Sequence, residues 1–215
     1  MESLQKQIQE VINGFVKQAP EDVVKTMVNA TADLKNSGIE DKSLKTGDIA
    51  PLFTLPNHKG EKCSLTDLLD DSLVVINFYR GGWCPYCNLE LSALQRALPE
   101  IEKTGARLIA ISPETSDNSL TTREKNNMAF DILFDQGNKL SEEFGLIFKL
   151  PELLRPIYDN FGLDIPAYNG DDSFVLPMPA TYIVGPEGKI LYHFIDADYT
   201  KRVEPSEIIN VLKNR

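Results

Sequence analysis

Cysteine and histidine are scarce in this sequence, which has three of the first and two of the second among 215 residues. A secreted disulfide framework normally carries more cysteines, in even number, so we expect no such framework here. His58 and His193 show no ligand spacing, and a tetrahedral zinc site is hard to assemble from so few parts. We therefore predict no metal and no cofactor.

Positive charge is also in short supply. Lys and Arg number 22 against 32 Asp and Glu, which gives a formal net charge of −10 at pH 7. Such a surface repels phosphate backbones and anionic lipid, so we expect no nucleic-acid partner and no membrane binding. The sequence has no apolar run of about 18 residues, and residues 1–7 are too polar for a signal peptide. These absences predict a cytoplasmic protein.

Two helices are predicted at the start of the chain, in a helical extension and linker that covers residues 1–45. Apolar residues recur there at helical spacing, among them Leu4 and Ile8 in the first helix and Met27 in the second. These helices either pack on the main domain, 46–215, or offer a surface to a second copy or another partner.

Strand and helix signals alternate from residue 50 onward, which predicts an α/β fold with a mixed central sheet flanked by helices. The nearly continuous apolar run 73–78 is typical of a strand buried on both faces. The segment 147–177 contains four prolines and is predicted to be an irregular insertion lying over the domain. The other predicted strands are 52–55, 61–63, 107–112, 130–134, 181–184 and 190–194, and the other predicted helices are 87–101, 116–127, 139–144 and one that begins near 205.

The cysteine pair Cys84 and Cys87 lies where the buried strand gives way to a helix. Backbone N–H groups at a helix N-terminus stabilise a thiolate, and a spacing of three residues puts the second sulfur one turn away. Pro85 suits the first helical turn, and Arg80 adds a positive charge nearby. Cys-x-x-Cys in this context indicates redox chemistry, although two ordinary buried cysteines or half of a metal site are alternatives. Cys63 is expected to be a small buried residue, or else a resolving thiol.

Over about residues 45–215 the sequence resembles the peroxiredoxins, in the branch close to the alkyl hydroperoxide reductases (the AhpC/TSA family). The resemblance implies a thioredoxin-like fold. It also implies that Cys87 attacks a peroxide and becomes a sulfenic acid, with Cys84 condensing with it to a disulfide. The residues that carry the resemblance are 50–55, Phe78 and Tyr79, Cys87 with Glu90 three positions on, 180–184 and the segment 198–205.

The sequence departs from the family at three positions. The family has proline at the position of Arg80, threonine at that of Cys84, and a peroxide-binding arginine at that of Pro179. We expect Arg80 or Arg202 to supply the missing guanidinium, the alternative being that both are solvated surface residues. Trp83 and Thr181 complete the candidate site, Trp83 beside the active loop and Thr181 in the quoted strand 180–184.

Pro179 also allows a different interpretation. Thioredoxin-like dithiol oxidoreductases keep a cis-proline opposite the Cys-x-x-Cys pair, and Pro179-Ala180-Thr181 resembles that arrangement, with a cis bond predicted after Met178. In that case Cys84 is the nucleophile and Cys87 the resolving thiol.

Three functions therefore remain open. The first is a thiol-dependent peroxidase that reduces hydrogen peroxide or organic hydroperoxides and is recycled by thioredoxin, glutaredoxin or glutathione. The second is a thioredoxin- or glutaredoxin-like thiol–disulfide oxidoreductase. The third is a redox sensor or partner-binding module without turnover. A homodimer is compatible with each of them.

Overall fold

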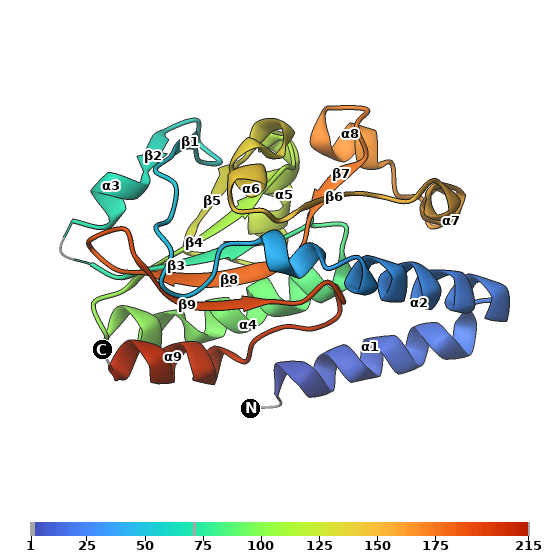
Figure 1. Ribbon diagram of the computed structural model, residues 1–215, viewed down its shortest axis with the longest axis horizontal. Helices are drawn as coiled ribbons and strands as arrows, with labels where there is room; N and C mark the ends of the chain where they lie inside the picture. Colours follow the sequence, from blue (N-terminus) through green and yellow to red (C-terminus); the bar gives the residue numbers. More distant parts are fainter. Residues whose placement is uncertain (1–2, 71, 215) are drawn as a thin grey trace.

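A mixed β-sheet forms the centre of the computed structural model, which describes residues 3–70 and 72–214 (Figure 1). Within these residues the main sheet has five strands in the order β5–β4–β3–β8–β9. Strands β3, β4 and β5 are parallel, whereas β8 and β9 are antiparallel to their neighbours. The α/β fold with a mixed sheet is thus confirmed. The strand bounds are β3 (Val74–Phe78), β4 (Arg107–Ser112), β5 (Asp131–Phe134), β8 (Ala180–Val184) and β9 (Ile190–Ile195).

Strand β3 explains the continuous apolar run in the sequence, because all of its residues are buried between two cores. Val75 and its neighbour on β8, Ile183, face the core under α4 (Pro85–Glu102) and α9 (Pro205–Lys213). Ile76 and Tyr182 face the opposite core, which α3 (Leu65–Leu68) and α6 (Lys139–Glu143) cover. Helix α5 (Ser116–Lys125) packs beside β5.

The N-terminal extension contains the two expected helices, α1 (Leu4–Gln18) and α2 (Glu21–Asn36), followed by the short η1 (Ile39–Lys42). Helix α1 contacts α4 and buries Leu4 and Ile8 in the core below the sheet. The side chain of Glu204, just before α9, accepts hydrogen bonds from the backbone N–H groups of Leu4 and Gln5. Both helices therefore pack on the domain.

The insertion 147–177 is more regular than the sequence predicts, and this part of the prediction is wrong. It contains a two-stranded antiparallel sheet of β6 (Ile147–Lys149) and β7 (Val175–Pro177), with short helices between the strands. Pro156 and Pro166 lie in the first turns of two of these helices, where a missing N–H costs nothing. The prolines thus start helices instead of preventing them. The helices are η3 (Glu152–Leu154), α7 (Arg155–Asn160) and α8 (Ile165–Asn169).

A small antiparallel hairpin of β1 (Thr54–Pro56) and β2 (Lys62–Ser64) confirms the turn predicted around residues 57–60. The short η2 (Gln136–Asn138) leads into α6. Helix α3 and the two-stranded sheet of the insertion were not predicted. In the part of the chain that the structure describes, no helix is both long and apolar enough to cross a membrane.

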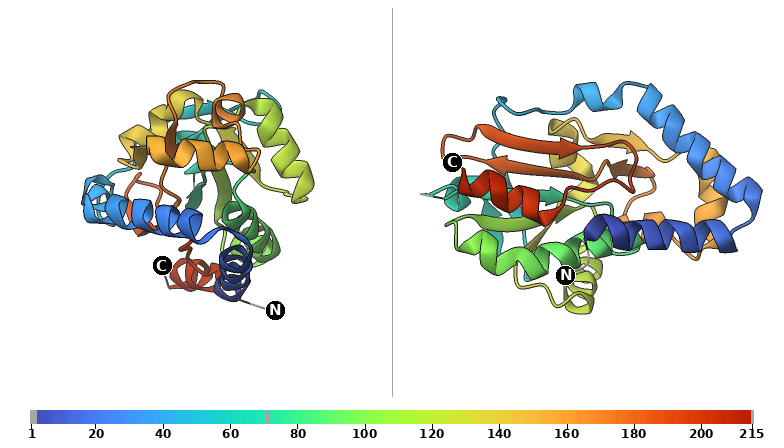
Figure 2. Two further views of the ribbon diagram at one scale, coloured as in Figure 1. Left: turned by 90° about the vertical axis from the view of Figure 1, so that its right-hand side faces the viewer. Right: turned by 90° about the horizontal axis from the view of Figure 1, so that it is seen from below.

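The extension and the insertion meet at one end of the sheet. Figure 2 shows α1, α2 and α7 gathered there, next to the start of α4. Ala30 of α2 packs with Leu154 and Tyr158 of the insertion in a core of its own. Phe15 of α1 and Phe161, just after α7, form an edge-to-face pair with ring centres 5.9 Å apart. This end of the molecule is therefore covered by two segments that are far apart in the sequence.

Candidate active site

The turn between β3 and α4 positions the cysteine pair. Cys84 is the N-cap of α4, and Pro85 is at the start of the helix, as the sequence predicts. Both cysteines are buried and unpaired, with exposed fractions of 1% for Cys84 and 0% for Cys87. Cys87 follows within the first turn of α4, and the two thiols interact closely enough to shift each other's pKa.

Two glycines let the turn fit closely against its surroundings. Gly81 has φ of +151°, and a Cβ atom there would lie 2.2 Å from Nε1 of Trp83. A Cβ atom on Gly82 would lie 1.9 Å from Oγ1 of Thr122. Neither space admits a side chain without displacing its neighbour, so the turn depends on both glycines.

Arg202 contacts the sulfur of Cys87. Its Nη2 lies 3.4 Å from Sγ, and its Nε donates to Oε2 of Glu90 at 2.6 Å. Its Nη1 donates to the carbonyls of Tyr199 and Lys201 in its own loop. Arg202 is only 2% exposed, so the alternative that it is a solvated surface residue is wrong.

Arg80 occupies an aromatic cage beside Cys84. Its guanidinium carbon lies 4.8 Å from the ring centre of Trp83 and 4.5 Å from that of Tyr199. Its Nη2 donates to the hydroxyl of Tyr158 at 2.5 Å. Arg80 is also 2% exposed, so the surface alternative is wrong for this residue too.

The two sulfurs have opposite pKa shifts. Burial raises the pKa of Cys84. The hydrogen bond from Cys87 and the positive charges of Arg80 and Arg202 outweigh this effect and lower the pKa to about 6. Burial, together with the hydrogen bond to Cys84 and its negative charge, raises the pKa of Cys87 well above the ordinary thiol value. The pair therefore holds one negative charge and one proton near neutral pH.

Two buried carboxyl groups lie around the pair. Burial raises the pKa of Glu90 to about 7, although the charge of Arg202 opposes this shift. Burial likewise raises the pKa of Glu114 to about 7, against hydrogen bonds that lower it. The Oε2 atom of Glu114 accepts from the hydroxyl of Tyr79 at 3.4 Å and from that of Thr122 at 3.3 Å. Glu114 thus holds the side chains of Tyr79 and Thr122 in place beside the turn.

Pro179 directly precedes the neighbouring strand β8, and Thr181 lies within that strand. Thr181 pairs in register with Asn77 of β3, and its Oγ1 accepts from Nδ2 of Asn77 at 3.2 Å. No described residue has a cis peptide bond, so the prediction of a cis bond after Met178 is wrong. The chain runs from β7 into β8 without a tight turn, and the trans bond is the lower in energy where no turn demands otherwise.

Cys63 lies apart from the pair, on β2, and packs against the core of the opposite sheet face. It is partly buried, and burial raises its pKa. In the described ranges 3–70 and 72–214, no group of three or more His, Cys, Asp or Glu side chains could hold a metal ion.

Sequence reasoning missed the aromatic residues that enclose the site. Tyr158 belongs to the insertion, and no local pattern connects it with the cysteines. Tyr199 stands three positions before Arg202 in the quoted segment 198–205, and that proximity was the available signal. Phe15 and Met27, from α1 and α2, line a cavity together with Cys84.

Comparisons with known structures agree with this architecture. A crystal structure of peroxidoxin BcpB from Mycobacterium tuberculosis superposes with a TM-score of 0.63 at 20% identity, covering 80% of this chain and 97% of that one. A structure of the peroxiredoxin 6 of Arenicola marina gives a TM-score of 0.64 at 20% identity, covering 79% and 72%. The fold is thus the thioredoxin-like fold of peroxiredoxins.

The sequence comparisons define the family. Residues 46–193 match the AhpC/TSA family, and the chain belongs to it. Peroxiredoxin Bcp of Escherichia coli (strain K12) is 33% identical over 103 residues, which are 48% of this chain and 65% of that protein. The chloroplastic peroxiredoxin Q of Sedum lineare is 30% identical over 116 residues, 54% of this chain and 61% of that protein. The matches thus span less than two thirds of these relatives.

Proposed function

We propose that this chain is a thiol-dependent peroxidase in which Cys87 attacks the peroxide and Cys84 resolves the product to a disulfide. The observation that carries this proposal is the contact between Nη2 of Arg202 and the sulfur of Cys87. A guanidinium there, held by Glu90, is positioned to polarise an O–O bond and to stabilise the departing oxygen. Arg202 replaces in this way the arginine that the family keeps at the position of Pro179.

The proton shared by the two sulfurs supports the reaction. In the resting pair Cys87 holds the proton and Cys84 the negative charge. Transfer of the proton to Cys84 makes Cys87 a thiolate, which attacks the distal peroxide oxygen and becomes a sulfenic acid. Cys84 then gives this proton to the departing oxygen, which leaves as an alcohol from an organic hydroperoxide or as water from hydrogen peroxide. The Cys84 thiolate attacks the sulfenic sulfur, forms the disulfide and releases hydroxide, which takes a proton to become water.

The substrates and the reductant belong to the proposal as well. The substrate is hydrogen peroxide or an organic hydroperoxide, and two reducing equivalents from a thiol reductant restore the pair. We place this cycle in the cytoplasm, where thioredoxin-type and glutathione-type thiols are kept reduced.

The test follows the loss of thiols after the reduced protein is mixed with hydrogen peroxide or cumene hydroperoxide. We expect oxidation much faster than that of free cysteine at the same pH. It should persist at a lower rate in Cys84→Ser, which lacks the sulfur that accepts the proton, and disappear in Cys87→Ser. Cys63→Ser is the matched control, because Cys63 is a partly buried thiol outside the site. Oxidation no faster than that of free cysteine would overturn the proposal.

A thiol–disulfide oxidoreductase is the second candidate, and one observation favours it. Cys84, the sulfur with the lower pKa, borders a cavity, whereas Cys87 has no exposed surface. A disulfide substrate would therefore meet Cys84 first. Rapid reduction of a model disulfide by the reduced protein, lost in Cys84→Ser, together with slow reaction with peroxide would favour this candidate.

A further inference from the structure

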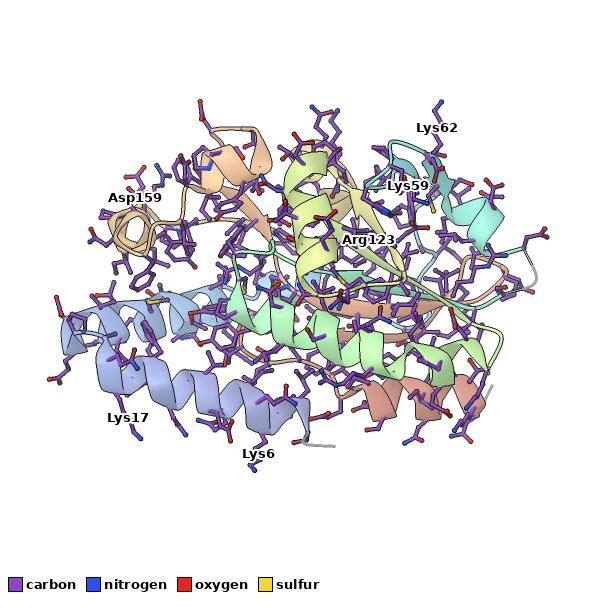
Figure 3. All side chains as sticks on the ribbon, turned by 180° about the vertical axis from the view of Figure 1, so that it is seen from behind. Lys6, Lys17, Lys59, Lys62, Arg123 and Asp159 are labelled. Atoms are coloured by element: carbon purple, nitrogen blue, oxygen red, sulfur yellow. The ribbon has the colours of Figure 1, made fainter. Side chains whose placement is uncertain are left out.

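A cavity of about 400 Å³ opens onto Cys84 and is covered by the N-terminal extension and the insertion. Its walls include Phe15 of α1, Met27 of α2 and Phe161, which follows α7. Figure 3 shows this end of the molecule from behind, with Lys17 and Asp159 on the outer sides of α1 and α7. A space of this size accommodates a small organic molecule.

Arg80 lines this cavity, and its positive charge has no carboxylate partner. Among the described residues, no carboxylate forms an ion pair with it, and its buried Nε has no hydrogen-bond acceptor. Arg202 differs, because its Nε donates to the carboxyl group of Glu90 at 2.6 Å. A buried guanidinium needs a negative charge nearby, and with no carboxylate partner Arg80 depends for it on the Cys84 thiolate.

Oxidation of the pair changes the charge that Arg80 faces. In the reduced protein the Cys84 thiolate is the negative group next to this arginine. Formation of the Cys84–Cys87 disulfide removes that thiolate, and Arg80 then faces an uncharged sulfur. An anion therefore gains more from binding to the oxidised protein than to the reduced one.

A protein reductant has poor access to the disulfide. Cys84 is 1% exposed, and Phe15 and Phe161, whose rings form an edge-to-face pair, line the cavity that leads to it. Thiol–disulfide exchange requires an attacking sulfur to approach the disulfide in line, and walls from α1, α2 and the insertion surround that approach. A small thiol fits inside the cavity as it stands.

We propose that the cavity is the binding site of the reductant, and that this reductant is a small thiol that carries a carboxylate. Its carboxylate binds Arg80 in the oxidised protein, and its carbon chain lies against the aromatic walls. The inference rests on the proposed redox cycle and deepens it by naming the chemical class of the electron donor.

The chemistry balances with two molecules of thiol. The first attacks Cys84 as a thiolate, forms a mixed disulfide and releases Cys87 as a thiolate beside Arg202, where it takes up a proton. The second thiolate attacks the sulfur of the small molecule in the mixed disulfide, forms a small-molecule disulfide and releases Cys84. The protein disulfide gains two electrons, and the two small thiols lose them.

The experiment starts from protein oxidised with diamide, so it needs no peroxide. Its reduction is followed with mercaptopropionate, with the uncharged mercaptoethanol and with a thioredoxin, each rate being expressed per thiolate. We expect mercaptopropionate to be at least about tenfold faster than mercaptoethanol, which corresponds to one charge-assisted contact. The preference should vanish in Arg80→Gln. The preference should remain in Arg155→Gln. Arg155 belongs to the insertion that covers the cavity, but its guanidinium stacks on Phe174, outside the cavity.

Benzoate, a carboxylate without a thiol, keeps the inference testable if Arg80→Gln fails to fold. It should slow the reduction of the wild-type protein by mercaptopropionate. It should also change the fluorescence of Trp83, the single tryptophan, more strongly in oxidised than in reduced protein. Equal rates for the two small thiols, a faster reaction with thioredoxin, or no effect of benzoate would each overturn the inference. A slow reaction with peroxide would instead contradict the proposed function alone.

Discussion

Arg202 and Cys87 are 115 positions apart in the sequence, yet Nη2 of Arg202 lies 3.4 Å from the sulfur of Cys87. The loop between β9 and α9 makes this contact, because its own carbonyls hold Nη1 and Glu90 holds Nε. Nη2 is left to point at the sulfur. The guanidinium is thus oriented before any substrate arrives, which is the condition for effective electrostatic stabilisation of a transition state.

Replacement of this arginine should therefore cost activity. In Arg202→Lys the charge remains but the fork geometry is lost, so a single ammonium cannot serve Glu90 and the sulfur together. We expect the second-order rate with peroxide to fall about 10²- to 10³-fold, the range for loss of one such donor. Stopped-flow measurement of thiol loss checks this. Arg107→Lys, at an exposed site on β4, is the matched control, and an unchanged rate in Arg202→Lys would remove this arginine from the mechanism.

The ionisation of the pair can be titrated directly. Burial opposes the thiolate of Cys84, but the hydrogen bond from Cys87 and the charge of Arg80 lower its pKa to about 6. In Cys63→Ser protein the ultraviolet absorbance of thiolate should therefore rise with pH through about 6. The size of this rise in absorbance should correspond to one thiolate per protein, because the pKa of Cys87 is raised. A single inflection near the ordinary thiol value of 9.0 would contradict this assignment.

The sequence predicts the local part of the site well. The buried run of β3, the Cys-x-x-Cys spacing and Pro85 at the helix start all act within about ten residues, where strand, cap and helix preferences apply. The mixed sheet and the two N-terminal helices follow from the same kind of signal, whereas the thioredoxin-like fold was implied by the family resemblance. These features need no knowledge of distant contacts.

The rest of the site depends on long-range packing. Nothing near Arg80 in the sequence reveals that Tyr158 and Tyr199 enclose it, because one comes from the insertion and the other from the loop before α9. The position of Arg202 beside Glu90 depends on the course of that loop after β9. An arginine is usually exposed, so the local sequence alone could not establish that both of these are buried.

The stability of the protein should depend on the protonation of Glu114. Its folded pKa, about 7, lies above the ordinary value of 4.5, so the folded state binds a proton more tightly than the unfolded state. The stabilising effect is complete below pH 4.5 and is lost as the pH rises through 7. The slope is on the order of 1 kcal/mol per pH unit for one such group.

Denaturant unfolding of the wild type and Glu114→Gln at several pH values tests this dependence. The difference in unfolding free energy between the two proteins should change between pH 4.5 and 7 and be flat on either side. Glutamine keeps an acceptor for Tyr79 and Thr122, so the comparison isolates the proton. A difference that does not vary with pH would show that Glu114 titrates in the folded protein as it does in the unfolded chain.

The close approach of Gly81 and Trp83 gives the last prediction. In Gly81→Ala the new Cβ atom would lie 2.2 Å from Nε1 of Trp83, and φ of +151° is unfavourable for any residue with a side chain. The indole must shift to make room, which changes its stacking on the guanidinium of Arg80, now 4.8 Å from its ring centre. We expect a loss of about 1–3 kcal/mol in unfolding free energy, the usual cost of strain in such a backbone conformation. The native tryptophan emission should shift to longer wavelength, because the ring becomes more exposed.

Gly105→Ala is the matched control for this variant. Gly105 also has a positive φ, +81°, but a Cβ atom there would meet nothing within 4 Å. Backbone strain should lower the stability of both variants, whereas only Gly81→Ala should change the emission of Trp83. If both spectra match that of the wild type, the indole does not depend on the space that Gly81 leaves open. If both shift, the change reflects general loosening of the fold, and the cage around Arg80 does not depend on this turn.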